Sequence, residues 1–145
     1  MTYRFETSEI LDRPIDKVFR FVAVEHVRNH PRWDPDIDLW LDADAPIGVG
    51  TIIRRRNRHS GTPVEGTMEV VEFEPNRVMA VVIHEGPAET RSSITFEAVS
   101  ESRTRLTIAG EIPGMDANAD MSGFEGLLQR SSRNRKHLIE SEIQA

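Results

Sequence analysis

Residues 13–35 read RPIDKVFRFVAVEHVRNHPRWDP, an amphipathic pattern that runs into closely spaced prolines. Pro14 suits the start of a helix, because its missing N–H would have no intrahelical partner there. Val18, Phe21 and Val22 recur at i, i+3 and i+4 and so form one apolar stripe. We therefore predict an amphipathic helix that packs this face on a core.

The prolines at the end of the stretch limit how far helical structure continues. Pro31 and Pro35 disfavour helical backbone in the residues that precede them. Residues 26–30 are therefore expected to form at most a short second helix, and Trp33 is expected to lie on a turn.

Most of the chain outside this stretch alternates polar and apolar residues between turn signals, which is typical of strands joined by hairpins. Near its end, apolar residues recur at helical spacing instead. The order predicts an α+β protein with an antiparallel sheet and a long C-terminal helix. The expected strands are 2–11, 37–41, 51–58, 64–73, 78–84, 89–99 and 103–112, and the expected long helix is 117–143.

Alternation also indicates which side chains of the late strands face inward. One face of strand 89–99 and one face of strand 103–112 are apolar, and we expect both to face the long helix. The run at 78–83 is apolar throughout and leaves its register open. The expected inward residues are Ile94, Phe96, Ala98, Leu106, Ile108 and Ile112.

Strand 51–58 is unusual because either register turns an arginine inward. One register points Arg54 inward, and the other points Arg55 inward. An inward arginine is costly unless it is paired with a carboxylate or a ligand anion. Two interpretations stay open: the arginines are solvated or paired with glutamates of strand 64–73, or one of them gives a pocket a preference for an acidic or polar ligand head.

Composition narrows the functional classes. With 145 residues the chain fits one domain, expected at 1–145, which can bury about two-thirds of its unfolded surface. The absence of cysteine excludes disulfides and thiolate metal sites and is compatible with a cytoplasmic protein, which we expect. The net charge of -6 disfavours nucleic acid as a partner. No apolar run is long enough for stable membrane insertion.

Histidines supply the few candidates for site chemistry. His26 and His30 have the i, i+4 spacing of metal ligands, but no third ligand is evident, and we predict no metal and no cofactor. His84 beside Glu85 is a weak acid–base candidate, because histidine titrates near neutral pH. No nucleophile motif or phosphate loop is present.

Four segments together resemble the START-like or Bet v 1-like superfamily (SRPBCC), in particular its polyketide cyclase/dehydrase and lipid-transport branch. They are residues 14–35, with Pro14 and a P-x-W-D-P end, IGVGT at 47–51, VVEFEPNR at 70–77 and SRTRLTI at 102–108. The resemblance implies a helix-grip fold, in which a curved antiparallel sheet wraps a long C-terminal helix around an internal cavity. The implied element order is β-α-α-β-β-β-β-β-β-α.

This resemblance implies three hypotheses of function. The first is binding or transport of a small, mostly hydrophobic or amphipathic molecule, such as a lipid, quinone or polyketide-like compound, by a monomer or homodimer. The second is a polyketide cyclase or dehydratase that uses acid–base chemistry in the same cavity. The third is a protein-interaction module of the Hsp90-activator type, which would use the outside of the sheet.

The candidate ligand-binding residues are those expected to face the cavity or its mouth. They come from the first helical stretch, the strands and the long helix. They are Phe21, His30, Trp33, Trp40, Arg54, Met68, Val70, Val82, His84, Ile94, Phe96, Leu106, Ile108, Met121, Phe124 and Leu128.

Overall fold

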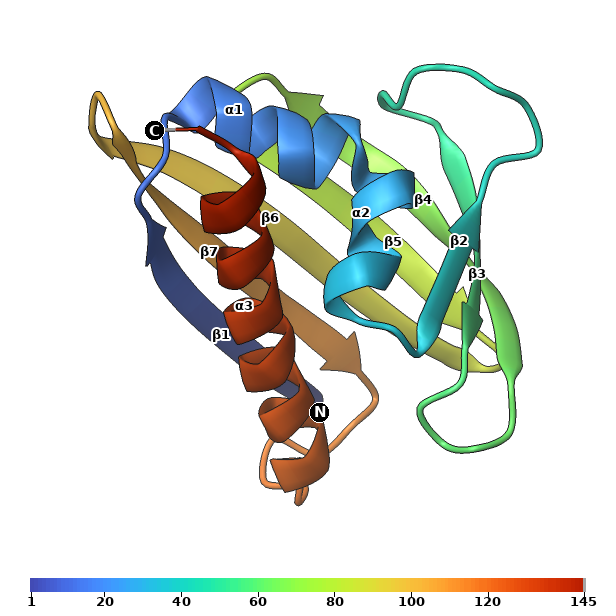
Figure 1. Ribbon diagram of the computed structural model, residues 1–145. Helices are drawn as coiled ribbons and strands as arrows, with labels where there is room; N and C mark the ends of the chain where they lie inside the picture. The colour runs from blue at the N-terminus through green and yellow to red at the C-terminus, as the bar shows by residue number, and fades with distance from the viewer. Residues whose placement is uncertain (145) are drawn as a thin grey trace.

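The strands form one curved antiparallel sheet, and the helices lie on its concave face (Figure 1). The structure is a computed structural model that describes residues 1–144. The α+β helix-grip architecture and the order of elements are as predicted. The elements are β1 (Thr2–Leu11), α1 (Ile15–Phe19), the π-helix η1 (Arg20–Val24), α2 (His26–Trp33), β2 (Ile37–Trp40), β3 (Ile52–Asn57), β4 (Val64–Glu74), β5 (Val78–Glu85), β6 (Ala88–Ser100), β7 (Arg103–Pro113) and α3 (Ser122–Glu142).

The sheet has seven strands in the order β1-β7-β6-β5-β4-β3-β2, so the first strand pairs with the last, and β2 lies at the far edge. The segment α1-η1-α2 carries the chain from one edge to the other, while α3 crosses the concave face (Figure 1). Alternating side chains of the strands pack inward with the first helices and α3. The core includes Val18, Phe19, Val22, Ile53, Val70, Phe96, Leu106 and Ile139.

Two helix boundaries differ from those expected. Trp33 is the last residue of α2 rather than part of a turn, because the Asp34 N–H bonds to the His30 carbonyl at 3.0 Å and closes the final turn. α3 begins at Ser122 rather than near residue 117. The carboxylate of Asp120 accepts from the Ser122 N–H at 3.2 Å, and such local bonds favour turns over continued helix.

The π-helix η1 widens one turn of the chain just before α2. The Glu25 N–H bonds to the Arg20 carbonyl five residues back at 2.9 Å. Buried side chains of α2 then bond to carbonyls of this wide turn. Asn29 Nδ2 donates to the Phe21 carbonyl at 2.8 Å, and His26 Nδ1 donates to the Val22 carbonyl at 2.8 Å. These bonds determine how α2 follows η1.

Burial of His26 has an electrostatic consequence. Its ring is almost fully buried. Burial disfavours the charged imidazolium and lowers the pKa of His26 to about 4, against an ordinary value of 6.5. The folded protein therefore holds this ring neutral at neutral pH.

A buried ion pair links α3 to β1. Arg135 Nη2 lies 2.7 Å from Glu9 Oε1, and the two side chains are only 3% and 8% exposed. Ser132 Oγ donates to the other Glu9 oxygen at 2.5 Å. The guanidinium of Arg135 also lies 5.5 Å from the centre of the Trp33 ring, a cation–π distance. One arginine thus contacts β1 and α2 from α3.

We predict that Arg135→Met lowers the free energy of unfolding by about 3–5 kcal/mol, because it leaves the Glu9 carboxylate buried and unpaired. Urea denaturation followed by circular dichroism measures this loss. Replacing both partners, in Glu9→Leu/Arg135→Met, should recover much of it. Arg54→Met is the control, because Arg54 pairs with Asp42 on the surface. The urea midpoint of this variant should equal that of the wild type. A urea midpoint of Arg135→Met equal to that of the wild type would contradict the stabilising role of this ion pair.

We also predict that acid weakens the fold through His26. The unfolded chain binds the proton at pH 6.5 and the folded chain only near pH 4, so stability falls as the pH is lowered through this window. The expected contribution of His26 to this loss is about 3 kcal/mol. Urea titrations at successive pH values measure the slope, and His26→Leu should make it shallower. An unchanged slope in His26→Leu would contradict this assignment.

Candidate ligand-binding pocket

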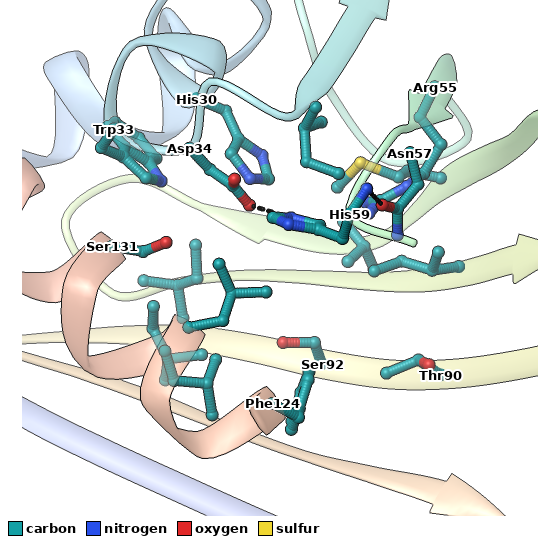
Figure 2. Close-up of a pocket in the computed structure, with 18 of the residues that line it drawn as sticks. His30, Trp33, Asp34, Arg55, Asn57, His59, Thr90, Ser92, Phe124 and Ser131 are labelled. Carbon is teal, nitrogen blue, oxygen red and sulfur yellow. Dashed lines mark hydrogen bonds and ion pairs between the residues drawn. The ribbon is translucent and has the colours of Figure 1, made fainter. Parts of the chain in front are cut away.

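A pocket of about 590 Å³ lies between the concave face of the sheet, α2 and α3. Sites for small molecules commonly have volumes of about 300–1,000 Å³ and mostly apolar walls. The walls here are mostly apolar, and Figure 2 shows polar side chains gathered where α2 approaches β3. The apolar lining residues are Phe5, Trp33, Ile37, Met68, Met79, Val81, Ile83, Ile94, Ile108, Ile112, Phe124, Leu127 and Leu128.

An aromatic contact joins α3 to β1 at the pocket wall. The Phe124 ring meets the Phe5 ring edge to face at 5.1 Å. Phe5 lies opposite Gly110 of β7, where a Cβ atom would come within 2.4 Å of the Phe5 ring. Glycine at this position therefore allows the Phe5 ring to lie across its neighbouring strand.

Ion pairs build the polar end. His59 Nε2 lies 3.0 Å from Asp34 Oδ2, and its Nδ1 lies 3.4 Å from Asp36 Oδ2 (Figure 2 draws the Asp34 contact). Arg55 Nε donates to Glu85 at 2.9 Å, with both side chains largely buried. The carboxylates beside these basic groups reduce the cost of burying their charges.

His30 joins the polar end to the aromatic wall. Its ring stacks on Trp33 with 5.5 Å between ring centres and an angle of 18°. His30 Nδ1 lies 2.9 Å from His26 Nε2, so the two imidazoles are hydrogen-bonded to each other. Burial is the main cause, ahead of nearby positive charges, of a pKa for His30 well below its ordinary value. At neutral pH this ring is therefore a neutral hydrogen-bonding group.

Several of the residues expected at the site line the pocket together. They are His30, Trp33, Met68, Ile94, Ile108, Phe124 and Leu128. Others lie in the core and do not line the pocket, because the first helices and neighbouring strands cover them. These are Phe21, Val70, Phe96 and Leu106.

Arg54 and His84 lie on the outer face, which corrects their expected place in the cavity. The register of β3 puts Ile53 and Arg55 on the concave side, so Arg54 points outward and pairs with Asp42 at 2.8 Å. His84 is 55% exposed and contacts Glu89 at 3.1 Å. The only acid–base candidate expected from the sequence therefore has no access to the pocket.

The remaining expected residues also lie away from the pocket. Val82 faces outward between the exposed Glu69 and Arg91 on neighbouring strands. Trp40 lies at the sheet edge, where the Arg56 guanidinium is 5.4 Å from its ring centre. Met121 immediately precedes α3 and does not line the pocket.

Polar residues of the pocket were largely missed in the sequence. Arg55 and Asn57 belong to the second of the two registers that the alternation of residues 51–58 allows. His59 had no sequence signal, because it follows the strand and reaches Asp34 across 25 positions. The pairing of Arg135 could not be predicted from the sequence, because its partner Glu9 lies near the other end of the chain.

The described residues offer little for a metal. Within 1–144, no three histidine, aspartate or glutamate side chains gather in a way that could hold an ion. The i, i+4 histidines bond to each other instead of sharing a ligand. Likewise, none of the helices in this range combines the length and apolarity of a bilayer-spanning segment.

Comparisons with known proteins agree with this geometry. The structure matches Ara h 8.0201 with a TM-score of 0.77 at 13% identity, over 98% of this chain and 100% of that one. It matches the Zhui aromatase/cyclase from Streptomyces sp. R1128 with a TM-score of 0.76 at 16% identity, over 100% and 98% of the two chains. A START superfamily protein from Mycobacterium smegmatis gives a TM-score of 0.76 at 11% identity, over 97% and 99%.

Sequence comparison assigns the family. A search among curated protein sequences finds no match. The family model described as "Polyketide cyclase / dehydrase and lipid transport" matches residues 2–140. The match spans nearly the whole chain, and the helix-grip structure is of the same kind as those of the solved proteins above. The chain therefore belongs to the polyketide cyclase/dehydrase and lipid transport family.

Proposed function

We propose that this protein binds a small, mostly apolar molecule in the pocket beneath α3. The observation that carries the proposal is the division of one pocket of about 590 Å³ into mostly apolar walls and a cluster of polar side chains where α2 approaches β3. Such a division suits a molecule that buries its apolar body and orients itself by one polar group. The family, which includes lipid transport, supports the same proposal.

The energetics favour an apolar body in this space. Transfer of apolar surface from water contributes about 25 cal/mol per Å². Met68 and Met79 line the wall, and the thioether side chain of methionine adapts to ligands of different shape. Lipid, quinone and polyketide-like molecules all carry an apolar body of this kind. We propose that the protein takes one of them as a carried or stored ligand.

Acid–base conversion of the bound molecule is a second candidate. The observation that favours it is the His59–Asp34 pair, at 3.0 Å, on the pocket wall. Such a pair can exchange protons with a bound molecule. Mass spectrometry of a bound ligand before and after prolonged incubation distinguishes the two candidates, since only the catalytic one changes the ligand.

We expect 2-naphthol, menadione or 1-decanol to raise the melting temperature of the protein, because each can bury an apolar body in the pocket. Leu128→Trp should abolish these shifts, since the larger ring occupies the space of the ligand. Val99→Trp is the matched control, because Val99 is exposed on the sheet and outside the pocket.

Two results would count against binding. One is the absence of any melting shift with all three probes, together with no co-purified small molecule in native mass spectra. The other is equal shifts in wild type and a folded Leu128→Trp protein, which would place the probes elsewhere.

A further inference from the structure

We infer that His30 Nε2 is a hydrogen-bond acceptor of fixed orientation, and that it selects neutral ligands that carry a hydroxyl group at their polar end. This inference rests on the proposed function and adds the chemical class of the ligand. Its starting point is a chain of hydrogen bonds that runs from the backbone of η1 to the pocket through His26 and His30.

The backbone sets the direction of this chain. The Val22 carbonyl can only accept a hydrogen bond, so His26 Nδ1, at 2.8 Å, must carry the proton. In a neutral imidazole the other nitrogen is then an acceptor. His26 Nε2 therefore accepts from His30 Nδ1 at 2.9 Å, and that proton makes His30 Nε2 an acceptor in turn.

Both rings must be neutral for this direction to hold. Burial lowers the pKa of His26 to about 4 and that of His30 well below its ordinary value, so neither ring is charged at neutral pH. The positive charges of Arg55 and Arg135 near the pair act in the same sense. The surrounding charges thus favour the neutral rings that this chain of hydrogen bonds requires.

The acceptor is accessible from the pocket. No hydrogen bond engages His30 Nε2 within residues 1–144, and no buried side-chain nitrogen or oxygen in that range lacks a partner. His30 Nε2 therefore keeps some accessible surface although most of the ring is buried, and the ring lines the pocket beside Asp34 and His59 (Figure 2). His59 differs, because both of its ring nitrogens face carboxylates.

The charges around His30 disfavour ionised ligand heads. The buried guanidinium groups of Arg55 and Arg135 are already paired with Glu85 and Glu9. A carboxylate would face the lone pair of His30 Nε2 unless the ring took up a proton against its lowered pKa. An ammonium group would have to lose its hydration in a mostly apolar pocket, which is costly. A hydroxyl donates to His30 Nε2 and brings no charge.

Three probes of similar shape test the selection at pH 7.5 by isothermal titration calorimetry. We expect 2-naphthol to bind about fivefold more tightly than 2-methoxynaphthalene, which cannot donate, since one hydrogen bond is worth about 1 kcal/mol. We also expect 2-naphthol to bind more tightly than 2-naphthoic acid. In His30→Phe the naphthol should lose its advantage over the ether, and in His30→Gln an amide oxygen should restore part of it.

The outcomes separate this inference from the proposed function. Equal binding of naphthol and ether to wild type, or tighter binding of the acid, overturns the hydroxyl selection and leaves the proposed function standing. If none of the three probes binds, the proposed function fails for aromatic ligands and the selection fails with it.

A measurement on the free wild-type protein tests the chain of hydrogen bonds without any variant. Long-range ¹H–¹⁵N correlation spectra distinguish the two tautomers of each imidazole. We expect the proton on Nδ1 in both His26 and His30 at pH 7.5. A proton on His30 Nε2 would overturn the inference, even if His30→Phe does not fold.

Discussion

The ion pair between Arg135 and Glu9 is the contact on which the pocket depends. It holds α3 against β1 on the concave face of the sheet (Figure 1). The same guanidinium lies over Trp33, and both His30 and Phe21 stack on that ring. The position and orientation of the Trp33 and His30 rings therefore depend on α3, the helix that covers the pocket. Loss of either partner would leave the other charge buried and unpaired, which is strongly destabilising.

The polar end of the pocket depends on a second feature, the wide turn of η1. Without that turn, the Phe21 and Val22 carbonyls would have helical partners instead of the side chains of Asn29 and His26. The resulting bonds orient His26, and His26 orients His30. A local departure from regular helix thus orients a polar side chain on the pocket wall. In a mostly apolar pocket, a few such groups determine which ligands bind.

The sequence predicted the fold well and the site only in part, and the difference has a physical basis. Strand alternation and the placement of Pro14 are local signals, so the strands, the first helix and the element order followed from them. The register of residues 52–57 depends on contacts with distant parts of the chain, which decide the face that packs on the core. Both registers turn an arginine inward, so the local sequence did not distinguish them. The contacts of Glu9 with Arg135 and of Asp34 with His59 join segments far apart in the chain, so no local sequence pattern predicts them.

Direct observation of a ligand beneath α3 tests the central claim most directly. The methyl groups of Met68 and Met79 line the pocket, whereas the methyl groups of Val71 and Val99 are exposed on the sheet. In a methyl-labelled sample with 2-naphthol, we predict intermolecular nuclear Overhauser effects from the naphthol ring to Met68 and Met79 and none to Val71 or Val99. Overhauser effects confined to the exposed valines would contradict the account, because they would place the apolar ligand outside the pocket.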